Sequence, residues 1–426
     1  MISEKEYKAR RERLAKKLSK NSVAVVFSGE FKTRSNDTEY PFRQNSNFYY
    51  LSGFTEDNAA LLFVKRKKKV QTILFVEKKD EKKELWSGKR VGEIEAKKLF
   101  LVDKVCTMND FSSKLKESLE DKNSLYYDFN LQYNKVKTLK RYSKKIAHYK
   151  NIALLVHEMR LIKSKQEIRL IQKAIGITKD AHHSAMALRK NGKYEYELQA
   201  EIEYIFKKNG AYSDAYTSIV ACGNSANTLH YISNDKPLVD KELILIDAGC
   251  EYEGYASDIT RSIPVDGKFT SAQKELYNMV LDVQKKIIKM IQPNVKRSDL
   301  HKKSEELLCK GMLKLGILEG KYRKLLKKEK HKKYYPHGIG HWMGLDVHDE
   351  APYKDKKGKE IPLKKGMVLT IEPGIYIDKD DKTVPKKYRG IGIRIEDDIL
   401  VTSKGYKNLS KKIAKSILEI EFISKT

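Results

Sequence analysis

The sequence predicts a mixed α/β protein in two parts: a small N-terminal α/β domain, residues 1–156, and a larger C-terminal domain, residues 157–426. Three observations predict this fold class. Apolar, β-branched runs alternate with helical patterns in the first part, a long amphipathic helix begins after Val156–Ile162, and a strand-acid-glycine pattern occurs twice in the second part. A chain of 426 residues is long enough for two domains.

The first part is expected to form a mixed sheet flanked by helices. Helical patterns cover Ile2–Leu18 and Glu93–Leu99. Buried strands are predicted at three β-branched and apolar runs that end in polar residues or glycine: Ser22–Phe27, Ala59–Lys65 and Val70–Glu77. Together these elements describe a small α/β domain.

The second part is expected to combine long helices with antiparallel hairpins. Ser164 and Glu167 have the spacing of a capping box, which predicts a helix that continues to about Arg189. Three more helices are predicted, at about Tyr194–Lys208, Ser271–Ile291 and Ser298–Leu315. Strand-rich segments separate them.

An internal echo indicates that this second part contains two related halves. The segment Leu243–Tyr252 resembles Val368–Tyr376, because each has an apolar strand, an acid, a glycine two residues later and then a tyrosine. Each is followed by a second acidic strand, Tyr255–Thr260 in one case and Gly392–Ile399 in the other. We expect each half to contribute one hairpin to a shared centre.

Composition and charge narrow the class of protein. The formal net charge is +29, from 86 Lys and Arg against 57 Asp and Glu. The excess is spread along the chain, and its densest run, Lys321–Lys333, alternates with apolar residues like the solvated face of a helix. We therefore predict no specific nucleic-acid partner, although a basic chain admits that alternative.

No membrane segment, signal peptide or cysteine framework is predicted. Apolar runs stay below the roughly 18 residues that a membrane-spanning helix needs, and the N-terminus lacks the apolar core of a secretory signal. A cytoplasmic location is expected. The widely spaced cysteines are expected to be small buried residues: Cys106, Cys222, Cys250 and Cys309.

Four acids at the ends of apolar strands point to a metal centre. A buried carboxylate is costly unless a positive charge compensates it. The four acids are Asp247, Asp258, Glu372 and Glu396, and His341 brings the number of candidate ligands to five. If two carboxylates bridge, these could hold two divalent ions about 3.5 to 4 Å apart that share a nucleophilic hydroxide. The hard ligand set favours Mn²⁺, with Co²⁺, Zn²⁺ or Fe²⁺ able to compete.

Three of the ten histidines crowd between His337 and His348. Gly338 and Gly340 argue against a helix here, so His337 and His341 are not expected to form a zinc site at helical spacing. His182 and His183 lie in a predicted helix, match no motif, and are interpreted as exposed polar positions.

The acidic and histidine segments resemble the metal-ligand segments of the pita-bread metallopeptidases, which include methionine aminopeptidase, prolidase and aminopeptidase P. The matching segments are Asp247–Gly249, Ser257–Arg261, His337–His341, Glu372–Gly374 and Arg394–Asp397. Three N-terminal segments resemble the front domain of the aminopeptidase P and creatinase type: Thr38–Phe54, Trp86–Arg90 and Val156–Leu161. The resemblance implies a pita-bread domain whose pseudo-twofold halves surround a dinuclear metal site. Methionine aminopeptidase usually lacks such a front domain.

The resemblance also implies a role for each ligand. Asp247 would chelate one ion, His341 and Glu372 would bind the other, and Asp258 and Glu396 would bridge them. Glu372 would also act as the general base toward the bridging water.

Other residues of the resemblance would face the substrate. His230 would meet it near the scissile bond, and His348 would stabilise the oxyanion. His337 would shape the proline side of the pocket. Weaker matches assign substrate or supporting roles to Asp37, Trp86, Tyr216 and Arg394, with Trp86 covering the proline pocket of its own or a neighbouring subunit.

The implied activity is a metallo-aminopeptidase that removes the first residue from peptides with proline in second position. Proline peptides would be the substrates, and the enzyme would be a homodimer or homotetramer. Prolidase, which cleaves Xaa-Pro dipeptides, shares the catalytic motifs, but the front domain favours the aminopeptidase. A non-catalytic pita-bread binding protein is the third alternative, which the five filled ligand positions disfavour.

Overall fold

The computed structural model describes residues 1–190 and 192–425, which fold as two compact units, Met1–Arg160 and Leu161–Thr426. The predicted boundary after residue 156 lies inside helix α7 (Ala153–Arg160). No helix within the described ranges is long and apolar enough to cross a membrane.

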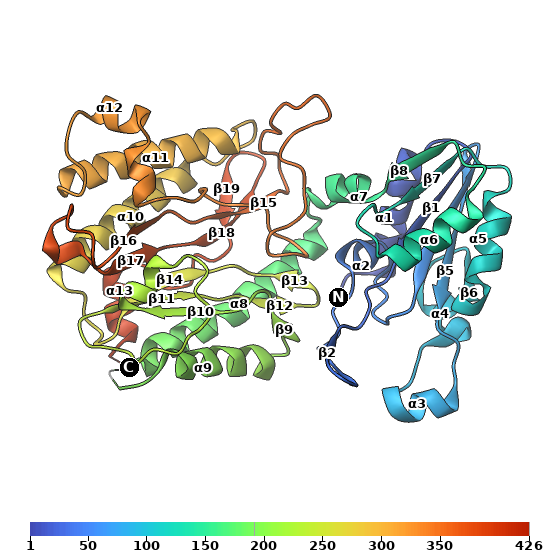
Figure 1. Cartoon of the computed structure of the whole chain (residues 1–426), viewed down its shortest axis with the longest axis horizontal. Helices are drawn as coiled ribbons and strands as arrows, with labels where there is room; N and C mark the ends of the chain where they lie inside the picture. Colours follow the sequence, from blue (N-terminus) through green and yellow to red (C-terminus); the bar gives the residue numbers. More distant parts are fainter. Residues whose placement is uncertain (191, 426) are drawn as a thin grey trace. The chain divides into compact units, whose positions relative to one another are not determined.

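The first unit is built on a mixed six-stranded sheet in the order β6-β5-β4-β1-β7-β8 (Figure 1). Its strands are β1 (Ser22–Phe27), β4 (Ala60–Arg66), β5 (Lys69–Val76), β6 (Lys104–Thr107), β7 (Ser124–Tyr127) and β8 (His148–Asn151). β4 runs antiparallel to β1 and β5, whereas β6, β7 and β8 add in parallel. The mixed sheet and the three strands predicted for it are confirmed.

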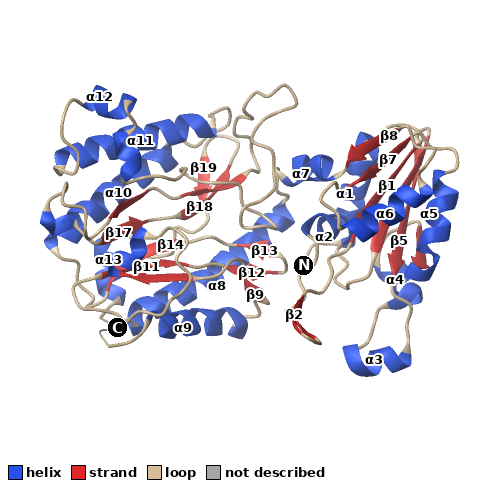
Figure 2. Ribbon diagram, viewed as in Figure 1, coloured by secondary structure: helices blue, strands red, loops and turns tan. Residues whose placement is uncertain are grey.

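Helices and a small hairpin complete this unit (Figure 2). The helices are α1 (Glu4–Lys17), α2 (Ser46–Ser52), α3 (Glu81–Ser87), α4 (Gly92–Leu99), α5 (Phe111–Leu119) and α6 (Tyr133–Tyr142). The hairpin pairs β2 (Thr33–Ser35) with β3 (Thr38–Glu39). Leu115 of α5 and Leu139 of α6 pack with Val25 of β1 in one apolar core, so these two helices cover the same face of the sheet.

The second unit places short antiparallel sheets between two pairs of helices. Figure 1 shows α8 and α9 along one side of the strands, and α10 and α11 along the other. The helices are α8 (Lys165–Leu188), α9 (Glu195–Lys208), α10 (Ser271–Lys289), α11 (Arg297–Lys314), α12 (Tyr322–Lys327) and α13 (Ile417–Ile423). Ser164 and Glu167 form the predicted capping box of α8. One continuous apolar core joins both helix pairs to the strands between them.

Two three-stranded sheets carry the segments that echo each other in the sequence. The first has the order β10-β11-β14 and the second β15-β18-β19, both antiparallel. Their bounds are β10 (Ile219–Cys222), β11 (Leu243–Asp247), β14 (Thr260–Pro264), β15 (Val368–Ile371), β18 (Asp397–Val401) and β19 (Tyr406–Asn408). Smaller sheets join β9 (Ser213–Asp214), β12 (Cys250–Tyr252) and β13 (Tyr255–Ala256), and β16 (Gly374–Ile377) with β17 (Ile391–Arg394).

The two halves meet at the ends of these strands. In each half an acid stands at the end of a central strand. Asp247 is the last residue of β11, and Glu372 directly follows β15. The amide of Glu396 donates to the Thr260 carbonyl at 3.1 Å, which ties the second half to the first. At Gly249 an added Cβ would lie 1.9 Å from the Ser257 carbonyl oxygen, so only glycine allows this hairpin to close.

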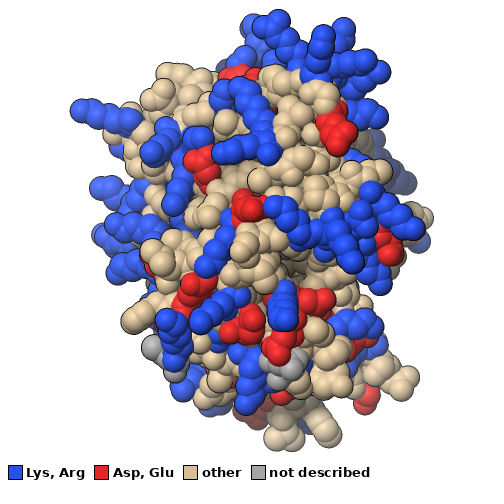
Figure 3. Space-filling view, turned by 90° about the vertical axis from the view of Figure 1, so that its left-hand side faces the viewer, with Lys and Arg blue, Asp and Glu red and all other residues tan. Residues whose placement is uncertain are grey.

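On the face of the molecule drawn in Figure 3, the basic side chains are spread out rather than gathered into one stripe. Figure 3 shows Lys and Arg side chains across one whole face, with acidic groups between them. The densest basic run does not form one continuous helix, because Glu329 adopts a left-handed conformation (φ 51°) between α12 and the 3₁₀ turn Lys330–Lys333. All four cysteines are buried and unpaired, as predicted.

Candidate active site

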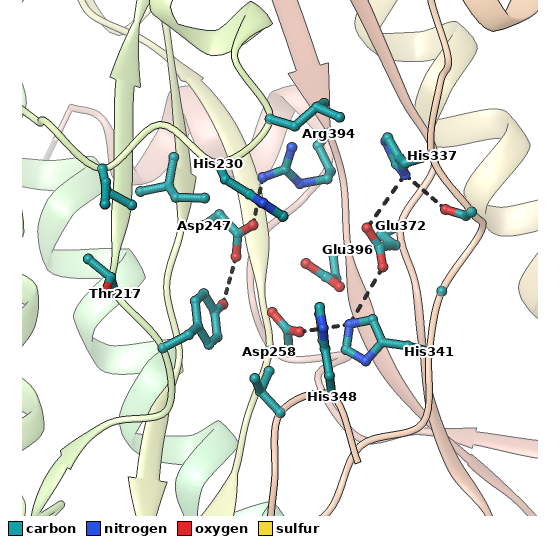
Figure 4. A pocket seen from close by; sticks show the side chains of 17 residues that line it. Thr217, His230, Asp247, Asp258, His337, His341, His348, Glu372, Arg394 and Glu396 are labelled. Atoms are coloured by element: carbon teal, nitrogen blue, oxygen red, sulfur yellow. Dashed lines mark hydrogen bonds and ion pairs between the residues drawn. The ribbon is translucent and has the colours of Figure 1, made fainter. Parts of the chain in front are cut away.

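A cavity of about 530 Å³ lies in the second unit, where the two halves meet. Figure 4 shows that carboxylates and imidazoles from both halves point into it. The structure brings ten of the predicted site residues to this cavity: Tyr216, His230, Asp247, Asp258, His337, His341, His348, Glu372, Arg394 and Glu396.

Strand pairing positions the carboxylates. Asp247 is the last residue of β11 and lies opposite Thr260 of β14. Asp258 precedes β14 by two residues, so it reaches the same end of the sheet. In the other half, Glu372 follows β15 and Glu396 precedes β18, and these two strands pair next to both acids. All four acids therefore converge on one space although they are far apart in sequence.

His341 completes the cluster. Its Nε2 lies 3.2 Å from Asp258 Oδ2 and 3.6 Å from Glu372 Oε1. One ligand atom each from Asp258, His341 and Glu396 lie within 4.8 Å of one another. The Nδ1 of His341 is 3.1 Å from the Trp342 carbonyl, which can only accept a hydrogen bond, so Nδ1 carries a proton and donates. Nε2 is therefore the nitrogen with a lone pair to offer a cation.

The electrostatics of the cluster show an excess of negative charge. Burial, reinforced by the charges of Asp258 and Asp247, raises the pKa of Glu372 to about 7. Burial and the neighbouring carboxylates raise the pKa of Glu396 well above its ordinary value. Burial alone would lower the pKa of His341, but Asp258 and Glu372 raise it to about 9. Carboxylates packed this closely are suited to divalent cations, which would remove the repulsion.

Asp247 is held by two side chains, one from the bend between β9 and β10 and one from β17. The Tyr216 hydroxyl donates to Asp247 Oδ1 at 2.6 Å, and Arg394 Nη2 donates to Oδ2 at 2.6 Å. Burial and the nearby carboxylates raise the pKa of Tyr216, so its hydroxyl keeps the proton it donates. Tyr216 and Arg394 thus both support a ligand at the wall of the cavity.

His337 is held by both of its ring nitrogens. Nδ1 lies 2.8 Å from the Gly338 carbonyl and Nε2 lies 2.8 Å from the Tyr376 hydroxyl, which also receives a hydrogen bond from Arg394. The carbonyl can only accept, so His337 donates from Nδ1 and accepts at Nε2. Burial and the Arg394 charge lower its pKa to about 4, in agreement with a neutral ring.

His348 and His230 stand at the edge of the cluster on loops. The rings of His348 and His341 are 4.0 Å apart between centroids. Burial and the charge of His341 lower the pKa of His348, so it is a neutral donor. His230 is exposed, and no hydrogen bond of the described residues holds its ring.

Asp37 and Trp86 are not among the residues that line the cavity. Both belong to the first unit, where Asp37 is exposed between β2 and β3 and Trp86 is 88% exposed on α3. Their proposed contact with substrate stays a prediction.

The prediction that His182 and His183 are exposed is wrong. His182 is fully buried, its Nε2 lies 3.0 Å from the Ala248 carbonyl, and burial lowers its pKa to about 4. It is therefore neutral and supports the backbone next to Asp247. His183 is partly buried, and its Nε2 accepts from the Ala414 amide at 3.1 Å. The spacing of His182 from Thr178 and Ala185, on the apolar face of α8, was the available signal.

Several supporting residues escaped the sequence reasoning. Thr260 donates to Glu396 at 2.8 Å, and Thr370 donates to Glu372 at 3.3 Å. Asp398 accepts from the Asp258 amide at 3.1 Å, and Tyr376 joins His337 to Arg394. Thr370 stands two residues before Glu372, so it faces the same side of an extended chain, which is a signal the sequence did contain.

Comparison with known proteins agrees with this geometry. Residues 169–403 match the model of metallopeptidase family M24, and residues 7–126 match the N-terminal domain of aminopeptidase P. The chain belongs to metallopeptidase family M24. The family and the fold are those that the sequence motifs predicted. The matches to family M24 and to full-length relatives show that the chain is a metallo-aminopeptidase.

Relatives match over nearly the whole chain. An Xaa-Pro aminopeptidase of Haemophilus influenzae is 39% identical over 420 residues, covering 99% of this chain and 97% of the relative. One of Escherichia coli is 38% identical over 432 residues with the same coverage. The solved structure of proline aminopeptidase P II from Yersinia pestis superposes with a TM-score of 0.96 at 37% identity and covers all of both chains.

Proposed function

We propose that this chain removes the first residue from peptides whose second residue is proline, using divalent cations held by Asp247, Asp258, His341, Glu372 and Glu396. The observation that carries the proposal is the convergence of four carboxylates and one imidazole in a single cavity that three more histidines also line. Relatives that match over the whole length are named Xaa-Pro aminopeptidases, which supports the choice of substrate.

The donor set fits two cations of the Mn²⁺ kind. Four carboxylates and one imidazole are hard ligands, and the raised pKa values of Glu372 and Glu396 express the repulsion that cations would relieve. Bound there, the cations would polarise the scissile carbonyl and lower the pKa of an attacking water toward neutrality. Mn²⁺ is the preferred ion, with Co²⁺, Zn²⁺ or Fe²⁺ as alternatives.

The chain's own groups divide the remaining work. Glu372 accepts the proton of the attacking water, because its carboxylate faces the centre of the cluster. His348 and His230 donate to the substrate on either side of the scissile carbonyl, where negative charge develops. His337, fixed by Tyr376, walls the proline side. An Xaa-Pro bond offers no N–H to a peptidase, so a site that acts on the carbonyl suits it.

The first unit is proposed to complete the substrate site within an oligomer. Trp86 is 88% exposed and its neighbour Leu85 is 84% exposed, which is unusual for large apolar side chains and suits a contact with another subunit or a peptide. The exposure of these side chains supports a homodimer or homotetramer in which Asp37 and Trp86 border a neighbouring cavity. The cytoplasmic location also stays a prediction.

The test compares Xaa-Pro-Yaa peptides of graded length with Xaa-Pro dipeptides, each with and without added Mn²⁺. We expect release of the first residue from tripeptides and longer peptides, and loss of activity after chelation. Cleavage confined to dipeptides would show a prolidase instead. Fewer than about one ion per chain after Mn²⁺ addition would indicate a binding protein.

A further inference from the structure

The loop between β10 and β11 carries His230 to the cavity. It leaves β10 at Cys222, and Leu229, His230 and Ile232 line the cavity wall. Since the His230 ring is exposed and held by no hydrogen bond of the described residues, the path of this loop decides where the imidazole lies.

One buried carboxylate contacts this loop at three points, at its start and at residues Tyr231 and Lys236. Glu195, the first residue of α9, is 0% exposed. Its Oε1 accepts from the Cys222 amide at 2.7 Å, and its Oε2 accepts from the Lys236 amide at 2.9 Å and from the Tyr231 hydroxyl at 2.8 Å. The three donors compensate a buried charge that would otherwise be costly.

Two asparagines hold the loop on either side of Tyr231. Asn227 Nδ2 donates to the Ile377 carbonyl at 3.0 Å. Asn234, buried and left-handed (φ 47°), accepts from the Val220 amide at 2.9 Å and donates to the Ser218 carbonyl at 2.8 Å. Between these two asparagines, the hydroxyl of the half-buried Tyr231 lies 2.8 Å from Glu195 Oε2 and 3.1 Å from the exposed Asp235 Oδ1, so Glu195 is the nearer acceptor.

The contact between Tyr231 and Glu195 affects His230 because the residues on either side of His230 face the protein interior. Leu229 and Tyr231 both pack against the small apolar cluster that contains Ile219 and Ala221 of β10. His230 stands between these two inward-facing residues, so its backbone is fixed from both sides. A displacement of Tyr231 would therefore move the imidazole.

We infer that Glu195 is a positioning residue that, through Tyr231 and the amides of Cys222 and Lys236, fixes His230 against the substrate. This inference rests on the proposed peptidase function, in which His230 meets the scissile bond. Neither Glu195 nor Tyr231 touches the reacting atoms, and both act through the loop.

The test is a double-mutant cycle on an Xaa-Pro-Yaa peptide with Mn²⁺. Tyr231→Phe removes one hydroxyl and leaves the two amide contacts of Glu195. We expect it to lower kcat about tenfold, as a small misplacement of a reacting group does, with little change in KM. In a His230→Ala background the same substitution should change kcat by less than about twofold. Tyr204→Phe, at an exposed tyrosine of the same helix α9, is the matched control.

Equal losses from Tyr231→Phe with and without His230 would overturn the inference, because the hydroxyl would then act on the structure in general. So would an unchanged kcat in the single variant.

Hydrogen exchange gives a second readout that needs no turnover. In Glu195→Gln the amide of the new side chain would face the donors of Tyr231 and Lys236, so residues 223–236 should exchange faster while residues 368–377 stay as in the wild type. Unchanged exchange in 223–236 would contradict the inference. If the wild type cleaves no proline peptide, the proposed function fails, and this measurement still decides the role of Glu195.

Discussion

The acids of the cavity and its two outer histidines are held in different ways. Asp247 and Glu372 stand at the ends of paired strands, so the register of the sheet places them. His230 and His348 stand on loops, each held by a buried charged group elsewhere in the chain. In the proposed function, the acids that would hold ions are thus placed by the strands, whereas the two histidines that would meet the substrate are placed by side chains that brace loops.

The brace of His348 is a buried ion pair. Asp349, the next residue, lies 2.9 Å from Lys163 Nζ, and the two side chains are 0% and 1% exposed. The Asp349 amide also donates to the Trp342 carbonyl at 2.8 Å. The His230 loop is held instead by the Glu195 carboxylate, which accepts hydrogen bonds from one neutral hydroxyl and two backbone amides of the loop. The comparison predicts that breaking the first brace costs stability, while breaking the second mainly costs turnover.

The largest effect is expected at a strand-borne acid. Glu372→Gln keeps the volume but removes the base and one charge of the cluster, so kcat should fall by roughly 10³-fold or more. Circular dichroism and the thermal midpoint of the variant should remain close to those of the wild type. Retained turnover would contradict the role given to Glu372.

Lys163→Met should destabilise the second unit by about 3 kcal/mol, because it removes the cation that pairs with the buried Asp349 carboxylate. Chemical denaturation measures the change. Lys286→Met, which removes an exposed pair with Asp282, is the matched control and should stay within about 0.5 kcal/mol. If Lys163→Met proves as mild as the control, the ion pair does not brace the loop.

His348→Ala and His230→Ala should each lower kcat about 10²-fold, since each removes a donor aimed at developing charge. Steady-state kinetics on a proline peptide provide the measurement. His148→Ala, at an exposed histidine of β8, controls for loss of an imidazole. A rise in KM alone would show that these rings bind substrate without acting in the transition state.

The smallest effect concerns pH and the cation-free protein. The folded pKa of Glu372 is about 7 and that of His341 is about 9, and both exceed their ordinary values. The lowered pKa values of His182 and His337 act in the opposite direction only below their ordinary value of 6.5. Between pH 6.5 and 9 these groups therefore bind more protons in the folded state than in the unfolded state. Stability of the chelated protein should therefore fall as pH rises through this window. The thermal midpoint should drop by several degrees, and saturating Mn²⁺ should flatten the profile. A midpoint that rises with pH after chelation would reverse the sign.

Sequence reasoning reached the strand-borne part of the site more fully than the loops. An acid directly after an apolar strand is visible in the chain, as at Asp247 and Glu372, and the capping box at Ser164 is local. Glu195 and Lys163 could not be found this way, because their partners lie far along the chain and depend on the path of a loop. His182 was misjudged because a polar residue in a helix resembles a surface position until its packing face is known.

The most direct test of this division is the Mn²⁺ content of two variants after dialysis, measured by elemental analysis beside the wild type. Asp258→Asn removes a proposed ligand two residues before β14, and His348→Ala removes the loop histidine whose ring lies beside His341. We predict that His348→Ala retains the Mn²⁺ content of the wild type while Asp258→Asn loses Mn²⁺. Equal loss in both variants would contradict the claim that the acids next to the strand ends hold the cations while His230 and His348 address the substrate.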